Sequence, residues 1–263
     1  MCNRHFKKII YSGLLLCSLN SAYAATDDVQ DMSDPLAVYT QAGAGYTDKG
    51  LNIKIGKSYD SGKADIMAMN VIEIKGILGD TLGTRDGRKD SIDIVRFRNF
   101  IVDTTNGQGT QVDVELNTIS NTGSASYSFI QTLPKVGKIQ FYPFAGVGLA
   151  VANNVNNHQL WSEANSPSGY SFPGAYALIG MYSKLEITDK IWFNYNPIWL
   201  TSIGGSTAYT ENTYAAGEDS VFTHEVSLSY QINPKMNIRY FGNWSDLVNF
   251  SDGDQRIEFN YQL

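Results

Sequence analysis

The sequence is poor in cysteine. Its only two cysteines, Cys2 and Cys17, both lie in the segment that we expect to be removed during export. The remaining chain then contains no thiol at all. This excludes a disulfide framework and a zinc site built on thiolates.

Long apolar runs are also scarce. After residue 24, no stretch approaches the ~20 apolar residues of a membrane-spanning helix, which excludes a helical membrane protein. The stretch 9–16 is apolar, follows the cations Arg4, Lys7 and Lys8, and precedes small residues that end at Ala24. That order is typical of a secretory signal peptide. We expect cleavage after Ala24, which makes residues 1–24 the signal peptide.

Positive charge is in the minority. The chain has 20 Lys and Arg against 26 Asp and Glu, a formal net charge of −6. Removing the three cations of the signal peptide takes this charge to −9. An acidic chain is a poor electrostatic partner for nucleic acid, so we expect no nucleic-acid partner.

The last nine residues, 255–263, alternate strictly between apolar and polar side chains. Such alternation predicts a β-strand with one apolar and one polar face. A strand of this kind at the carboxyl terminus resembles the closing strand of bacterial outer-membrane β-barrels, where it is an assembly signal. That family usually ends in Phe, and Leu263 stands in its place. The residues that carry the resemblance, and that we expect to act as the assembly signal, are Ile257, Phe259, Tyr261 and Leu263.

Eleven further segments alternate in the same way or are bounded by turn residues. Short and long connections follow one another in the carboxyl-terminal half, as in outer-membrane barrels. We predict an all-β fold: a transmembrane antiparallel up-and-down β-barrel of 12 strands over residues 36–263, after a short periplasmic lead at 25–35. Ten strands remain if 36–46 and a further segment are not strands, and a secreted β-sandwich is the soluble alternative. The predicted strands are 36–46, 51–59, 64–78, 91–103, 110–119, 124–133, 138–151, 174–187, 190–202, 220–232, 236–246 and 255–263.

Charged residues gather on the face of these strands that we expect to point inward. Two interpretations stay open: a lumen filled by ion pairs, and a narrow pore whose charged walls select solutes. Arg96 and Arg98 are candidates for contacting anions, but pairing with Asp113 and Glu115 on the next strand is favoured, because opposite charges stabilise neighbouring strands. The candidate lumen residues are Lys54, Glu73, Lys75, Arg96, Arg98, Asp113, Glu115, Lys184, Glu186, Glu225, Arg239, Arg256 and Glu258.

Histidine is rare, which weakens any catalytic interpretation. After cleavage only His158 and His224 remain. The hydrolases among outer-membrane barrels need a histidine close to a serine. His158 falls in a predicted loop, and His224 alternates with Phe222 on a face that we expect to point outward. We therefore expect no enzymatic activity, no cofactor and no metal.

These observations predict an outer-membrane channel for passive diffusion of small polar or charged solutes. The long loops at 152–172 and 203–219 are expected to fold over its mouth. The alternative is a plugged structural or adhesive barrel whose loops bind a partner, and a barrel hydrolase is a third hypothesis. The expected partners are outer-membrane lipid and lipopolysaccharide, the barrel assembly machinery and small solutes.

Overall fold

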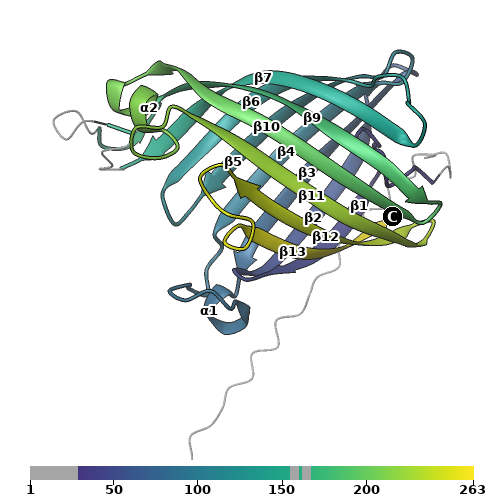
Figure 1. The fold of residues 1–263 in the computed structure, drawn as a ribbon, viewed down its shortest axis with the longest axis horizontal. Helices are drawn as coiled ribbons and strands as arrows, with labels where there is room; N and C mark the ends of the chain where they lie inside the picture. The colour runs from purple at the N-terminus through teal and green to yellow at the C-terminus, as the bar shows by residue number, and fades with distance from the viewer. Residues whose placement is uncertain (1–28, 155–159, 162–166) are drawn as a thin grey trace, which may run out of the picture.

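The chain folds into a closed antiparallel β-barrel (Figure 1). The structure is a computed structural model, and it describes residues 29–154, 160–161 and 167–263. Within these ranges twelve strands form the wall, as the sequence predicts. They are β1 (Gln41–Thr47), β2 (Gly50–Asp60), β3 (Ile66–Ile77), β4 (Ile94–Asp103), β5 (Gln108–Asn117), β6 (Thr122–Gln131), β7 (Ile139–Asn153), β9 (Gly174–Thr188), β10 (Ile191–Gly205), β11 (Ser220–Asn233), β12 (Met236–Ser245) and β13 (Asp254–Gln262).

Two pairings close the wall. β1 pairs with β13, from Gln41 opposite Gln262 to Thr47 opposite Arg256. β6 pairs with β7, from Thr122 opposite Ala152 onward. The short strand β8 (Tyr170–Ser171) pairs only with the end of β7 and stands outside the ring. Closure gives each wall strand a partner on both sides, which a barrel in lipid requires because no water can satisfy an open edge.

Alternation along each strand separates an apolar outside from a polar inside. Ile55 on β2, Ile72 on β3 and Ile257 on β13 are large apolar side chains that remain exposed. On β4 Phe97 and Ile101 are exposed in the same way, and Arg96 and Arg98 on the opposite face of this strand line the interior. An apolar exterior around a charged interior is the arrangement that suits a barrel surrounded by lipid.

The two ends of the barrel differ. We call the turn end the one that holds the chain terminus after β13 and the short connections 61–65, 104–107, 132–138, 189–190 and 234–235. We call the other the loop end, which holds the long connections after β3 and β10 as well as the short turns 48–49 and 118–121. The short helices α1 (Gly79–Leu82) and α2 (Thr207–Asn212), which the sequence analysis did not predict, both lie there, away from the C-terminus (Figure 1). Neither of them, nor any other helix among the described residues, is long and apolar enough to cross a membrane.

The start of the barrel is the main correction to the sequence prediction. A strand was expected over 36–46, but β1 begins at Gln41. The preceding residues enter the barrel, where Leu36 and Val38 are buried against Met69 and Phe144 of the inner wall. Of the predicted lead, Met32 to Pro35 also lie in the interior, where they line the cavity. The apolar part of the inner wall buries Leu36 and Val38 inside the barrel, so this part of the chain does not extend strand β1.

Candidate functional site: the charged barrel lumen

A cavity of about 810 Å³ occupies the barrel interior. Near the turn end its lining includes Met32 of the N-terminal segment and Ile130 of β6, and near the loop end it includes Thr47 and Asp254. The cavity therefore runs along much of the barrel between the two ends. Such a space is the expected location of a solute path.

The structure places the predicted lumen residues on the inner face of the barrel. Asp113 lies on β5 between Gln111 and Glu115, which both line the cavity, and it accepts a hydrogen bond from Arg96. Lys184 and Glu186 contact each other near the turn end. Ten of the thirteen line the cavity directly: Lys54, Glu73, Lys75, Arg96, Arg98, Glu115, Glu225, Arg239, Arg256 and Glu258. Their role in selecting solutes stays a prediction.

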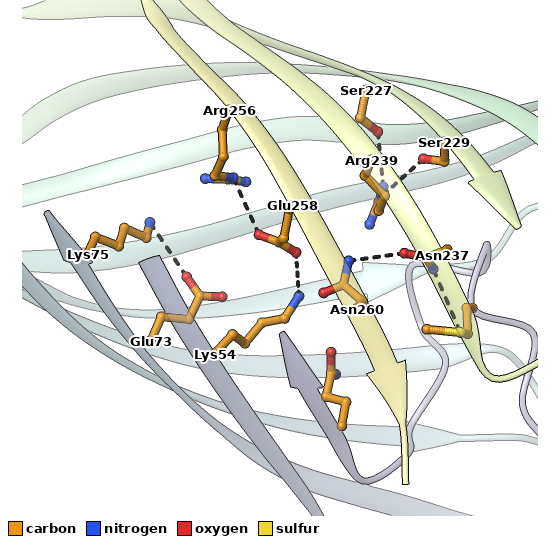
Figure 2. A network of polar contacts seen from close by, with 12 residues as sticks. Lys54, Glu73, Lys75, Ser227, Ser229, Asn237, Arg239, Arg256, Glu258 and Asn260 are labelled. Atoms are coloured by element: carbon orange, nitrogen blue, oxygen red, sulfur yellow. Dashed lines mark hydrogen bonds and ion pairs between the residues drawn. The ribbon is translucent and has the colours of Figure 1, made fainter. Parts of the chain in front are cut away.

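Glu258 on β13 is linked to β2 across the seam of the barrel (Figure 2). Its carboxylate accepts a hydrogen bond from Lys54 Nζ on β2 at 2.7 Å and contacts Arg256 Nε at 3.4 Å. β1 lies between β2 and β13, and its inward position opposite Lys54 is Gly43. A Cβ atom there would come within 3.2 Å of Lys54 Cε. The missing side chain thus leaves the space through which Lys54 reaches Glu258.

Glu73 on β3 holds a second pair of cations. Lys75 Nζ lies 3.5 Å from its carboxylate, and Arg98 on β4 donates to it as well. Arg96 instead pairs with Asp113 and lies 3.8 Å from Glu115 on β5. The predicted pairing toward β5 is therefore confirmed for Arg96 and wrong for Arg98. Each arginine pairs with an acid that lies two residues along the neighbouring strand from the residue directly opposite the arginine. Long side chains can span this diagonal distance.

Arg239 on β12 is held by neutral groups. Its guanidinium donates to Ser229 Oγ at 3.0 Å, to Ser227 Oγ at 3.0 Å and to Asn194 Oδ1 at 3.1 Å. Figure 2 shows it turned toward the two serines of β11. None of the carboxylates in the described part of the chain lies within 4.0 Å of it. Ser227, Ser229 and Asn194 were not among the predicted lumen residues. The alternation of polar and apolar residues does place them on the inner face of their strands.

The N-terminal segment, residues 29–40, narrows the turn end of the lumen. Leu36 and Val38 pack into an apolar cluster on the inner wall, and Asp31 lies 3.0 Å from Lys184 Nζ on β9. Burial alone would raise the pKa of Asp31. Hydrogen bonds from Ser33 and the ion pair with Lys184 outweigh it and hold this pKa below its ordinary value. Apolar packing and an ion pair therefore anchor the segment inside the barrel.

The fold can be compared with known structures. No protein-family model and no curated protein sequence matches this chain. The NanC porin superposes with a TM-score of 0.53 at 8% identity, covering 85% of this chain and 100% of that one. An outer membrane channel from Pseudomonas putida F1 superposes with a TM-score of 0.50 at 7% identity, covering 91% of this chain and 98% of that one. The chain has the fold of a bacterial outer-membrane β-barrel channel.

His224 is part of a cluster of aromatic side chains. His224 stacks on Trp244 with ring centroids 4.9 Å apart and meets the edge of Phe222 at 4.6 Å. Its ring nitrogen Nδ1 shares a hydrogen bond with the Tyr195 hydroxyl at 2.9 Å. This is an aromatic cluster rather than a histidine and serine arrangement. His158 lies outside the described residues, and within those residues no cluster of His, Cys, Asp and Glu suits a metal ion.

Proposed function

We propose that the protein is a passive diffusion channel of the bacterial outer membrane for small polar or charged solutes. The observation that carries the proposal is the 810 Å³ cavity with charged walls inside a closed barrel whose exterior is apolar. Solutes would move down their concentration gradient and exchange water for lumen side chains on the way. The proposal includes export with removal of residues 1–24, and it involves no enzymatic step.

The proposed orientation puts the turn end in the periplasm and the loop end outside the cell. Its support is the difference between short and long connections, which outer-membrane barrels share. The apolar side chains of β13, Ile257, Phe259 and Tyr261, together with the terminal Leu263, are exposed on the outer face. In this proposal they contact lipid and serve as the signal for the barrel assembly machinery. The long loops would contact lipopolysaccharide.

A second candidate is a plugged structural barrel whose loops bind a partner. The N-terminal segment favours it, because Leu36 and Val38 are buried inside the barrel and occupy lumen that would otherwise be open. The channel is the better supported of the two, since the cavity still has lining residues near both ends.

Single-channel conductance separates these candidates. The refolded chain of residues 25–263 is placed in a planar bilayer, and folding is checked by heat-shifted gel mobility. Discrete current steps in KCl support the channel. Silence from a folded barrel, followed by current once residues 25–38 are deleted, supports the plugged barrel and contradicts the open channel.

A further inference from the structure

The wall formed by β2, β3, β4, β12 and β13 carries more positive than negative charge. Glu258 contacts both Lys54 and Arg256, and Glu73 contacts both Lys75 and Arg98. Two carboxylates thus serve four cations, and Arg239 adds a fifth. On the adjoining strands the balance is reversed, because Asp113 and Glu115 on β5 both face one further cation of the wall, Arg96 on β4, and Glu225 on β11 accepts a hydrogen bond from the neutral Asn196. The positive surplus is therefore local to this wall, which we call the cationic wall.

Phe241 on β12 brings two of these cations together. The guanidinium carbon of Arg239 lies 4.7 Å from the centre of the Phe241 ring, and that of Arg256 lies 4.2 Å from it. The ring stabilises each cation through its negative face. Two positive groups on one ring also repel each other, and of these two arginines the Glu258 carboxylate contacts Arg256 but not Arg239. An anion that entered between them would relieve this repulsion.

Arg239 has donor capacity left for such an anion. Its hydrogen bonds use Nε and Nη2, and among the described residues none engages Nη1. Among the described residues, neither Glu225 nor Glu258 forms an ion pair with Arg239. A guanidinium held in place by serine and asparagine oxygens keeps its full charge, so it is preorganised to bind a carboxylate.

The opposite side of the cavity carries apolar side chains beside neutral polar ones. Its lining includes Ile130 of β6, Tyr182 of β9 and Ile198 of β10, together with Asn194 and Asn196 of β10. β6 and β9 stand about half-way round the ring from β13 and β2. A wholly hydrated solute gains nothing from these apolar side chains, whereas a hydrocarbon or aromatic group gains ~25 cal/mol for each Å² that it buries against them.

We infer that the lumen takes small organic anions with an apolar body, namely aromatic or short aliphatic monocarboxylates. The carboxylate is bound at Arg239 and Arg256, and the apolar body lies toward Ile198 and Tyr182. This inference rests on the proposed channel function and names its solute class. A lumen for inorganic anions would need only the cationic wall, and a lumen for sugars would need neither the charge surplus nor the aliphatic side chains.

Three matched probes test this class on the conducting barrel. Benzoate carries both charge and ring, acetate carries the charge alone, and benzyl alcohol carries the ring alone. In a KCl gradient the reversal potential is expected to show preference for anions. Benzoate is expected to reduce the KCl current at a concentration about tenfold lower than acetate, with no block by benzyl alcohol. Preference for cations, or equal block by acetate and benzoate, would overturn the inference.

Variants locate the two halves of the site. Arg239→Gln is expected to raise the half-blocking concentration of benzoate and acetate alike, by about tenfold. Ile198→Thr is expected to raise that of benzoate only. Arg85→Gln is the matched control, because Arg85 pairs with Asp48 outside the cavity lining and its loss is expected to change neither value. A benzoate block unaffected by Arg239→Gln would overturn the assignment.

Calorimetric titration of the same detergent-solubilised barrel with benzoate separates this inference from the channel proposal. Binding that Arg239→Gln weakens about tenfold, in a barrel that passes no KCl current, would contradict the channel and retain the anion site. Current in KCl without any benzoate binding would retain the channel and overturn the anion site.

Discussion

Lys54 on β2 donates a hydrogen bond to Glu258 on β13 over the strand that separates them. The distance of 2.7 Å is possible because β1 presents Gly43 at the crossing point. The closing seam of the barrel is therefore held by side chains as well as by the backbone ladder. Both side chains are largely enclosed, so their interaction is screened less than a surface ion pair.

The first prediction concerns Gly43. Gly43→Ala is expected to lower the free energy of unfolding by about 1–2 kcal/mol, because its Cβ atom would lie 2.7 Å from Asn260 Oδ1 and force a shift. Denaturant unfolding of the barrel in detergent measures this. Gly204→Ala is the control, since nothing lies within 4 Å of a Cβ atom at that position. Equal stability of the two variants would contradict the account of the seam.

The second prediction compares the two partners of this ion pair. Glu258→Gln is expected to destabilise the barrel by about 3 kcal/mol, because it leaves both Lys54 and Arg256 without a carboxylate. Lys54→Met is expected to cost less, since Glu258 keeps Arg256. Denaturant unfolding gives the order of the two. In the bilayer, Glu258→Gln is also expected to increase the preference for anions, because it adds to the positive surplus of the cationic wall.

The third prediction concerns the N-terminal segment. Replacing Leu36 and Val38 together by serine is expected to raise the single-channel conductance severalfold, because the segment loses the apolar burial that holds it in the lumen. Val29→Ser is the control, since Val29 is exposed. An unchanged conductance in the double variant would show that this segment does not limit the current.

The fourth prediction concerns pH and the anchor at Asp31. The folded-state pKa of Asp31 lies below its ordinary value of 3.8, so its ion pair with Lys184 stabilises the segment above that value. The stabilisation is lost as the pH falls through the lowered pKa. We expect acidification below pH 3.8 to increase the conductance of the wild-type chain more than that of Asp31→Asn. Glu186 also contacts Lys184 and is present in both proteins, so the difference between their conductances reports on Asp31.

Strand positions and facing directions were predictable because they depend on a local pattern. In β2, Ile53 and Ile55 alternate with Lys54, and a period of two fixes which side chains point inward once one face is known to be apolar. The same pattern predicts that Arg96 and Arg98 point into the lumen, where both line the cavity. The twelve-strand count followed from the repetition of this pattern along the chain.

The path of the N-terminal segment and the partners of Arg98 and Arg239 were not predictable, because they depend on contacts between residues distant in the sequence. Leu36 and Val38 alternate as a strand would, and only the inner wall that they meet shows why they enter the lumen instead. Arg98 has a direct partner in Asp113 and a diagonal one in Glu73, and the choice between them depends on three strands at once. The hydrogen bonds that hold Arg239 likewise depend on three strands, because Arg239 lies on β12 and its partners lie on β10 and β11.

Conductance of the refolded chain of residues 25–263 in a planar bilayer tests the central claim most directly. The account predicts discrete, salt-dependent steps with preference for anions, and a block by benzoate that Arg239→Gln weakens. Persistent silence from this chain, when heat-shifted gel mobility shows that the barrel is folded, would contradict it, whether or not deletion of residues 25–38 then restores a current.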